Sequence, residues 1–248
     1  MNDFKTATGK TPGNKIFAKF RAQNGIGWGL EGPVSTEDIT VEGIPTGSLT
    51  NIVMTETFST VSIAWDALVV GADTGYNLIT SYQLHTQNLG DLSTSTATLT
   101  GEGPHSLTLT KGVDYKFTIT PYNFYGPGPQ VVQLFTWRTV PGDPTGLSVD
   151  VTQPNFVFSW TNPTDTGGSP LTGVVIKMED SVPQDVTIDL TNCDESPVVD
   201  QCTLNQENEI KTALGKVTGD TINIKLTLEN AQGSSNEVSF VSPALIDP

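Results

Sequence analysis

The chain has 248 residues, and its 24 glycines, 16 prolines and low share of charged residues (16%) favour short strands and frequent turns over long helices. Acidic residues outnumber basic ones 27 to 12, and this balance argues against nucleic acid and anionic membrane surfaces as partners. No stretch approaches the roughly 18 consecutive apolar residues of a membrane helix, so we expect no direct membrane insertion. These features predict an all-β chain.

An alternating strand followed by a turn occurs three times in chain order, at residues 16–29, 115–128 and 222–235. When the three copies are aligned on one asparagine each, apolar residues fall mostly on one face of the strand and polar residues on the other. The aligned residues are Asn24, Asn123 and Asn230. Three residues after each asparagine comes a glycine: Gly27, Gly126 and Gly233. The copies therefore predict one repeated strand and turn.

A second predicted strand occurs twice and ends in tryptophan, at Trp65 and, 95 residues later, at Trp160. Turn-forming residues and a new strand follow each tryptophan, and the first of these new strands contains Tyr82. Boundary prolines keep a similar period, since Pro45 precedes Trp65 by 20 residues and Pro141 precedes Trp160 by 19. A period of this length, built of short alternating strands, suits a complete β-sandwich domain.

These motifs together resemble fibronectin type III domains. The resemblance rests on the two tryptophan strands, on the Asp-Thr-Gly-Gly-Ser-Pro turn at 165–170, and on the Tyr-x-Phe-x-Ile strand that begins at Tyr115 and closes in Asn-x-x-Gly. It covers essentially all of residues 44–248. It implies an all-β fold of tandem immunoglobulin-like (fibronectin type III) β-sandwiches. The expected core residues are Trp65, Trp160, Tyr82 and Tyr115.

Three parts follow from this resemblance. Residues 1–43 match only the last strands of such a domain, residues 44–140 form one full domain, and residues 141–248 form a second with a cysteine-containing insertion at 180–214. Because two sandwich edges cannot stand alone in water, we expect residues 1–43 to pack on a neighbour, to be completed by another chain or to come from cutting a longer protein. The insertion is also similar to fibronectin type III-like repeats of very large surface proteins of single-celled eukaryotes.

The two cysteines, Cys193 and Cys202, enclose eight residues of the predicted insertion. This spacing allows a local disulfide across an acidic loop, and the alternative is two buried thiols. A disulfide would indicate an oxidising compartment. We expect no zinc site, because no histidine or further cysteine lies nearby in the sequence.

The sequence offers little for catalysis. His85 and His105 are the only histidines, and we place the first on the outer face of a strand and the second in a turn. No Gly-x-Ser-x-Gly elbow, P-loop or dinucleotide fingerprint occurs. We therefore predict a chain that is not an enzyme and holds no cofactor or metal. Calcium binding by the acidic residues is an alternative, but no Asp-x-Asp-x-Asp-Gly loop occurs, and the acids also suit a solvated surface.

Aromatic residues in the predicted turns are candidates for contacts. Trp28 and Tyr125, with Phe124 and Trp137, suggest an end of a sandwich that serves as interdomain packing or as a binding patch. Of the two roles we favour interdomain packing, because a short Pro-rich linker brings successive sandwich ends together.

Two functions follow from the predicted architecture, because the fold alone does not fix a function. The first is a structural module of a multi-repeat extracellular or surface protein that builds a rod or filament through head-to-tail contacts. Residues 1–21 hold five basic residues and one acidic residue, whereas residues 141–248 have a net charge of −12. The second is an adhesive or receptor-like module that binds a protein or glycan through sandwich loops. The expected partners are other copies or neighbouring repeats of a longer chain.

Overall fold

The computed structural model describes residues 9–152, 154–179, 185–187, 200–205 and 210–243. Within these ranges nearly all regular structure is strand, and α2 (Thr212–Leu214) is a single short turn of helix. None of the described helices is long and apolar enough to span a membrane. The chain divides into two compact units, of which the second comprises residues 57–59, 109–113 and everything from 136 onward.

The first unit contains a sandwich of two antiparallel sheets. One sheet has three strands in the order β5 (Val53–Glu56), β6 (Val61–Ala64) and β9 (His105–Leu107). The other is built around β10 (Asp114–Asn123), which pairs with β7 (Ile79–Asn88), β11 (Gly126–Pro127) and β12 (Val131–Thr136). Strand β8 (Thr94–Leu99) extends this sheet beyond β7.

The core of the first sandwich follows the period-2 pattern of its strands, because alternate side chains of a strand point to one face of the sheet. Tyr115, Phe117 and Ile119 of β10 are buried, while the residues between them are partly exposed. Trp65, which directly follows β6, meets Tyr82 of β7 edge to face with ring centroids 5.1 Å apart. This contact joins the two sheets through aromatic packing.

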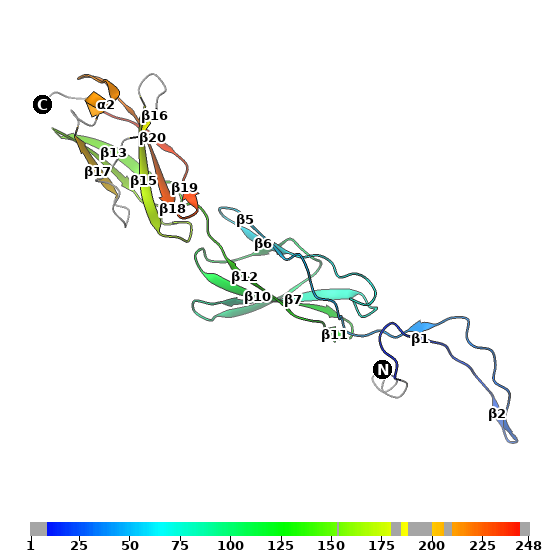
Figure 1. Cartoon of the computed structure of the whole chain (residues 1–248). Coiled ribbons are helices and arrows are strands. Elements are labelled where there is room, and N and C mark those ends of the chain that lie inside the picture. Colours follow the sequence, from blue (N-terminus) through cyan, green and yellow to red (C-terminus); the bar gives the residue numbers. More distant parts are fainter. Residues whose placement is uncertain (1–8, 153, 180–184, 188–199, 206–209, 244–248) are drawn as a thin grey trace. The chain divides into compact units, whose positions relative to one another are not determined.

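The second unit repeats this arrangement. One sheet has the order β13 (Thr145–Thr152), β14 (Asn155–Thr161) and β17 (Gln201–Asn205). In the other, β18 (Asn223–Asn230) pairs with β15 (Leu171–Glu179), β19 (Gly233–Ser234) and β20 (Val238–Val241), and β16 (Asp185–Thr187) lies beyond β15 (Figure 1). Phe156, Phe158 and Trp160 of β14 pack with buried residues of β15, β17 and β18 in a single core.

Two placements made from the sequence are wrong. Cys202 does not lie in a polar loop but in β17, where it is buried and pairs in register with Phe158. Its alternation with polar neighbours is that of a half-buried strand. Cys193 lies outside the described residues, so the disulfide stays a prediction. His105 begins strand β9 rather than lying in a turn, and its ring centroid is 5.3 Å from that of Trp65.

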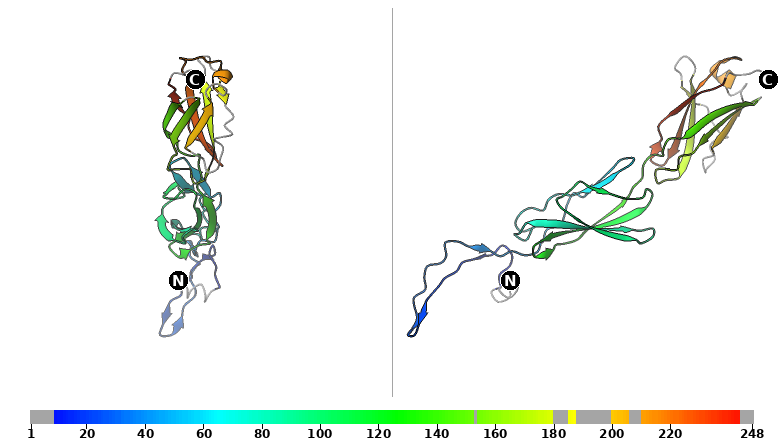
Figure 2. Two further views of the ribbon diagram at one scale, coloured as in Figure 1. Left: turned by 90° about the vertical axis from the view of Figure 1, so that its left-hand side faces the viewer. Right: turned by 180° about the vertical axis from the view of Figure 1, so that it is seen from behind.

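Residues 9–43 form a separate run of short strands within the first unit. β1 (Lys15–Ile16) pairs with β4 (Ile39–Thr40), and further along β2 (Gln23–Asn24) pairs with β3 (Gly27–Trp28) around a tight turn (blue in Figure 2). Backbone hydrogen bonds from Gly29 to Ala22, Gly32 to Phe20 and Ser35 to Ala18 continue this hairpin between the two pairs. The segment is thus held mainly by backbone bonds.

Replacing Trp160 by Ala is expected to lower the free energy of unfolding by about 3–5 kcal/mol, because the change removes a large buried ring and leaves a cavity. Urea unfolding followed by circular dichroism measures the loss. Trp28→Ala is the matched control, since Trp28 is exposed and its loss should cost about 0.5 kcal/mol or less. Equal losses for the two variants would contradict the core position of Trp160.

Candidate functional site

An asparagine corner, defined as the last asparagine of the repeated strand and the three residues after it, occurs at residues 24–27, 123–126 and 230–233. In every copy the asparagine Oδ1 accepts a hydrogen bond from the backbone N–H two residues later. The donors are Ile26 (2.9 Å), Tyr125 (2.8 Å) and Gln232 (2.8 Å). Such bonds are local, so each corner forms from its own few residues.

A second shared bond closes the hairpin two residues beyond each corner. The backbone N–H that lies five residues after the asparagine donates to the carbonyl two residues before it, at 2.8 Å in all three copies. The pairs are Gly29 with Ala22, Gly128 with Pro121, and Ser235 with Leu228. The three copies therefore share one local structure, as well as one sequence pattern.

The second and third corners each donate hydrogen bonds to the segment of chain that precedes the first strand of the same sandwich. We call these segments, residues 43–45 and 139–141, the lead segments. Asn123 Nδ2 donates to the carbonyls of Gly43 (2.6 Å) and Thr74 (2.9 Å). Asn230 Nδ2 donates to the carbonyls of Thr139 and Thr166, each at 2.8 Å. Both asparagines are buried, so these bonds satisfy amide groups that would otherwise be costly to remove from water.

The Asp-Thr-Gly turns at 73–75 and 165–167 also accept hydrogen bonds from the lead segments. The N–H of Gly43 donates to the carbonyl of Gly75 at 2.8 Å, and the N–H of Thr139 donates to the carbonyl of Gly167 at 2.9 Å. Both turn glycines have positive φ, +67° for Gly75 and +74° for Gly167. A side chain at either position would collide with lead-segment carbonyls, so the close approach requires glycine.

The first corner has the local hairpin of the other two, but no lead segment among the described residues packs against it. Asn24 is exposed, and within the described ranges its Nδ2 donates no hydrogen bond. A Cβ added to Gly126 or Gly233 would meet Ile44 (3.5 Å) or Val140 (3.3 Å), whereas one added to Gly27 would meet nothing within 4 Å. The first corner therefore has the hairpin of the other two without a lead segment in it.

The strand before the first corner is equally uncovered. Phe20 aligns with Ile119 of β10 and Leu226 of β18, which are both completely buried, yet Phe20 is 78% exposed. In the two sandwiches the opposite sheet covers this face of the strand, and Leu226 accordingly shares one core with Phe156 and Phe158 of β14. The same position thus changes from core to surface with the loss of its neighbours.

The structure gives Trp28 and Tyr125 different surroundings. Trp28 is exposed and lies under the guanidinium of Arg21, at 4.6 Å from the ring centroid. Tyr125 donates from its hydroxyl to Glu42 Oε2 at 3.0 Å and contacts Phe124 edge to face. Trp137, in contrast, belongs to the second unit. Phe124 and Tyr125 thus contact each other, while Trp28 lies against Arg21 and Trp137 against Lys111.

Charges on the N-terminal segment are partly neutralised within it. Lys15 pairs with Asp38 at 2.7 Å, and Lys19 pairs with Glu31 at 3.4 Å. Both pairs are largely exposed, so each contributes little to stability. They nevertheless reduce the positive field that the sequence of residues 1–21 suggests.

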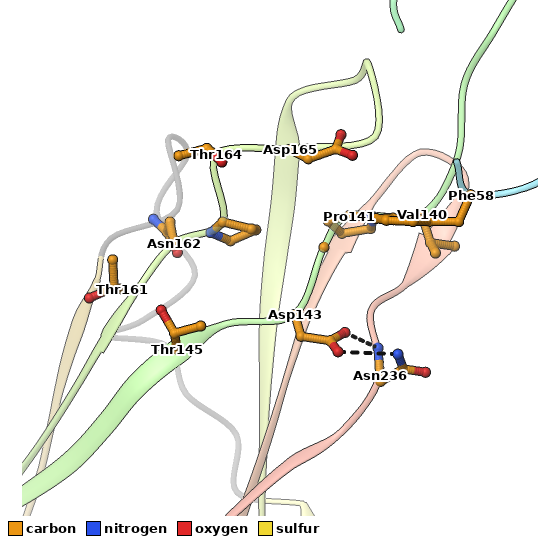
Figure 3. A pocket seen from close by; sticks show the side chains of 12 residues that line it. Phe58, Val140, Pro141, Asp143, Thr145, Thr161, Asn162, Thr164, Asp165 and Asn236 are labelled. Carbon is orange, nitrogen blue, oxygen red and sulfur yellow. Dashed lines mark hydrogen bonds between the residues drawn. The ribbon is translucent and has the colours of Figure 1, made fainter. Parts of the chain in front are cut away.

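A groove of about 640 Å³ lies in the second unit (Figure 3). Its apolar side is made of Phe58, Val140, Pro141 and Pro163, and threonine and asparagine side chains from 161–164 form much of the rest. Asp143 accepts hydrogen bonds from the backbone N–H of Asn236 (3.0 Å) and from its Nδ2 (3.2 Å). The groove could hold an extended peptide or a sugar.

Lys111 lies beside this groove and is partly buried, with 11% of its side chain exposed. Its Nζ lies 2.6 Å from Asp165 Oδ2 and 3.8 Å from the ring centroid of Phe58. Burial raises the pKa of Asp165, but the hydrogen bond and charge of Lys111 and the N–H of Gly167 outweigh it, so the pKa lies below its ordinary value. Throughout the described part of the chain, no three His, Cys, Asp or Glu side chains are grouped to hold a metal ion.

The strand order decides the fold of both sandwiches. When the short strands β11 and β19 are left out of the count, the first, second and fifth strands of each sandwich form one sheet, and the third, fourth, sixth and seventh form the other. Both are fibronectin type III-like sandwiches. The chain is a tandem of them, preceded by the unfilled third copy of the asparagine corner.

No family model matches the chain. Among solved structures it is similar to a two-domain fibronectin type III segment of chicken tenascin, with 17% identity and a TM-score of 0.44 over 78% of this chain and 97% of that one. It is also similar to the FN1–FN3 domains of chicken CNTN1, with 17% identity and a TM-score of 0.39 over 95% of this chain and 76% of that one. The similarity to surface proteins of single-celled eukaryotes stays a prediction.

Sequence reasoning found the asparagine corners but missed what they bind. The signal was present, because the triplet Asp-Thr-Gly occurs at both 73–75 and 165–167, before the third strand of each sandwich. Only the second triplet was used for the resemblance. Lys111 carried no comparable signal, since it is separated from Asp165 by 54 residues and belongs to no repeated pattern.

Replacing Asn230 by Ala is expected to lower the free energy of unfolding by about 2–3 kcal/mol, because two partly buried carbonyls lose their donor. Asn123→Ala should have a similar effect. Asn24→Ala is the matched control and should cost about 1 kcal/mol or less, since only its local turn is lost. Chemical unfolding of the three variants measures the difference, and equal losses would contradict the distinction between filled and unfilled corners.

The Lys111–Asp165 pair predicts a pH dependence. Because the folded pKa of Asp165 lies below its ordinary value of 3.8, the pair contributes stability that is present above about pH 4 and is lost as the pH falls through the folded pKa. Asp165→Asn should flatten the fall in melting temperature below about pH 4, and Lys111→Met should do the same. An unchanged pH profile in both variants would show that Lys111 does not hold the proton off Asp165.

Proposed function

We propose that this chain is a non-catalytic structural module of a multi-repeat extracellular or surface protein, in which residues 1–43 make head-to-tail contacts within a rod or filament. The observation that carries the proposal is the first asparagine corner, which has the local structure of the other two but, in the described part of the chain, no second sheet that covers it. An uncovered strand and turn of this kind can bind another polypeptide chain.

The exposed apolar side chains of the N-terminal segment support an assembly role. Seven large ones lie at the surface: Phe17, Phe20, Ile26, Trp28, Leu30, Val34 and Ile39. Exposed apolar groups gathered on one segment mark interaction sites, whereas scattered ones need no explanation. Burying each of these side chains contributes about 1.5–3 kcal/mol to the free energy of binding, before the cost of association is subtracted. Covering several of them is therefore enough to support a specific contact.

The direction of assembly is proposed from the difference between the two ends of the chain. A contact between unlike surfaces leaves a free surface at each end of the complex and propagates into a fibre when it does not close on itself. The region 141–248 has a net charge of −12, opposite in sign to the basic excess of residues 1–21. Since Lys15 and Lys19 are already paired, apolar contact rather than charge should dominate. Association should then survive moderate salt.

An extracellular or cell-surface location forms part of the same proposal. It rests on the resemblance of the sequence to fibronectin type III repeats and on the predicted pairing of Cys193 with Cys202, which would need an oxidising compartment. Alkylation of the unreduced native protein, followed by mass spectrometry, tests it: two reactive thiols would argue against such a compartment.

The second candidate function is an adhesive or receptor-like module that binds a protein or glycan through sandwich loops. The groove of the second unit favours it, because proline and phenylalanine side chains lie there beside threonine and asparagine groups. Phe58→Ala separates the two functions: loss of attachment to a target surface with unchanged self-association would favour adhesion, and the reverse would favour the structural role.

Replacing Phe20 by Ser is expected to weaken self-association of the full chain by about tenfold or more, with an almost unchanged melting temperature, because Phe20 contributes to an interface and not to a core. Sedimentation equilibrium over a range of concentrations measures the association. Phe124→Ser is the matched control, since Phe124 is 83% exposed but lies outside the N-terminal segment. A wild-type chain that stays monomeric at high concentration, or equal effects of the two variants, would contradict the proposal.

A further inference from the structure

The hairpin formed by β7 and β8 carries almost no charge, although the chain as a whole is acidic. Residues 74–101 contain both strands, and Asp91 in the turn between them is the only charged side chain of this stretch when His85 is neutral. The net charge of the chain is −15, so two copies repel each other over much of their surfaces. The hairpin is a region where two copies can approach without that repulsion.

Strand β8 lies at the edge of its sheet. Among the described residues, β7 is the one strand that pairs with it. β8 runs for six residues without a charge, a proline or a bulge, and all of its side chains except Leu99 are exposed. Edge strands are usually protected by one of these features, because their open N–H and C=O groups pair readily with another strand.

The ladder between β7 and β8 shows which backbone groups face the open edge. The N–H of Asn88 donates to the carbonyl of Ser93 at 2.9 Å, so these two residues form a hydrogen-bonded pair. Such pairs alternate with non-hydrogen-bonded pairs along an antiparallel ladder, and the register of β8 has no shift. The N–H and C=O groups of Thr94, Thr96 and Thr98 therefore point away from β7.

We propose that β8 pairs antiparallel with β8 of a second copy of this chain, across a two-fold axis at Thr96. Thr96 then lies opposite Thr96 of the second copy, and Thr94 lies opposite Thr98. The two sheets join into one continuous sheet. This contact is separate from the one proposed for residues 1–43, and it closes at two chains because the same surface is used by both.

This register pairs every outward-pointing residue of β8. Each pair of threonines exchanges both of its backbone hydrogen bonds, and threonine opposite threonine is a favourable cross-strand pair. On the other face of the strand, Ser95 lies opposite Ala97, and both side chains are small and exposed. A shift by one residue would place outward-pointing groups opposite groups that already face β7. The edge is therefore complementary to itself.

The size of the contact indicates its role. One pair of six-residue strands is a small contact beside the roughly 1,200 Å² or more that a stable interface buries, so isolated chains should pair weakly. Repetition of the same contact along two multi-repeat chains would strengthen it through effective concentration. We assign it to the side-by-side joining of rods. That role rests on the proposed function, whereas the pairing of two β8 strands does not.

Engineered cysteines test the register. Thr96→Cys places two cysteines opposite each other with Cα atoms about 5.5 Å apart, which a disulfide can span. Mild oxidation of the full chain should link the copies, and peptide mass spectrometry should show position 96 bonded to position 96. Thr94→Cys is the matched control and should link at least tenfold less, since its two copies lie about 13 Å apart. A mixture of Thr94→Cys and Thr98→Cys chains should link readily.

A proline tests the backbone hydrogen bonds. Thr96→Pro removes an N–H that points to the open edge, so β8 should still pair with β7. Thr96→Val is the matched control, because it also loses the hydroxyl contact with His85 Nδ1 (3.1 Å) but keeps the N–H. Both changes are made in the Phe20→Ser chain, to weaken the contact proposed for residues 1–43. In sedimentation equilibrium the proline variant should dimerise at least tenfold more weakly than the valine variant, with a similar melting temperature.

The outcomes separate this pairing from the proposed head-to-tail assembly. Preferential linkage at position 96, with loss of dimers on Thr96→Pro, supports the pairing. Equal linkage of Thr96→Cys and Thr94→Cys, or dimers that Thr96→Pro leaves unchanged, contradicts it. A wild type that pairs through β8 but forms nothing larger than a dimer would uphold the pairing and contradict the rod. Long assemblies without linkage at position 96 would do the reverse.

Discussion

The side-chain amide of one asparagine per sandwich is the constraint on which the architecture depends. When β10 and β18 are buried, Asn123 and Asn230 lose their access to water, and each Nδ2 then needs two carbonyl acceptors. One comes from the lead segment and one from the Asp-Thr-Gly turn. Three stretches of chain far apart in the sequence must therefore meet at one point. The turn glycines follow from this, because a side chain there would strike the lead-segment backbone.

The N-terminal segment separates the local part of this arrangement from the long-range part. Its corner keeps the Asn24 turn and the bond between Gly29 and Ala22, which involve residues within a few positions of one another. Among the described residues, its Asn24 amide makes no contact to another segment and Phe20 is not buried, whereas the corresponding features of the sandwiches depend on strands distant in the sequence. Local hydrogen bonds can form a hairpin without a core, but they leave an apolar face in water. That combination is why the segment is proposed as an assembly surface.

The sequence predicted those features that leave a periodic trace. Alternation identified the strands around Trp65 and Trp160, and both tryptophans are 4% exposed. The strand around Cys202 was not predicted, because the surrounding stretch 180–214 is polar. The alternation is nevertheless present, since Cys202 and Leu204 alternate with Gln201 and Thr203. His105 was predicted in a turn because it follows Gly103 and Pro104, but the turn ends before His105 and strand β9 begins there. The Lys111 pair and the carbonyl partners of the asparagines leave no such trace, since they depend on which loops the fold brings together.

The most direct test of this account is side-chain amide hydrogen exchange of the three corner asparagines, followed by nuclear magnetic resonance on the full chain in dilute and concentrated solution. The account predicts slow exchange at Asn123 and Asn230 under both conditions. Asn24 should exchange freely when dilute and become protected only at concentrations where the chains associate. Protection of Asn24 in the dilute monomer, or free exchange at Asn123 and Asn230, would contradict the claim that two corners are filled within the chain and one is open to a partner.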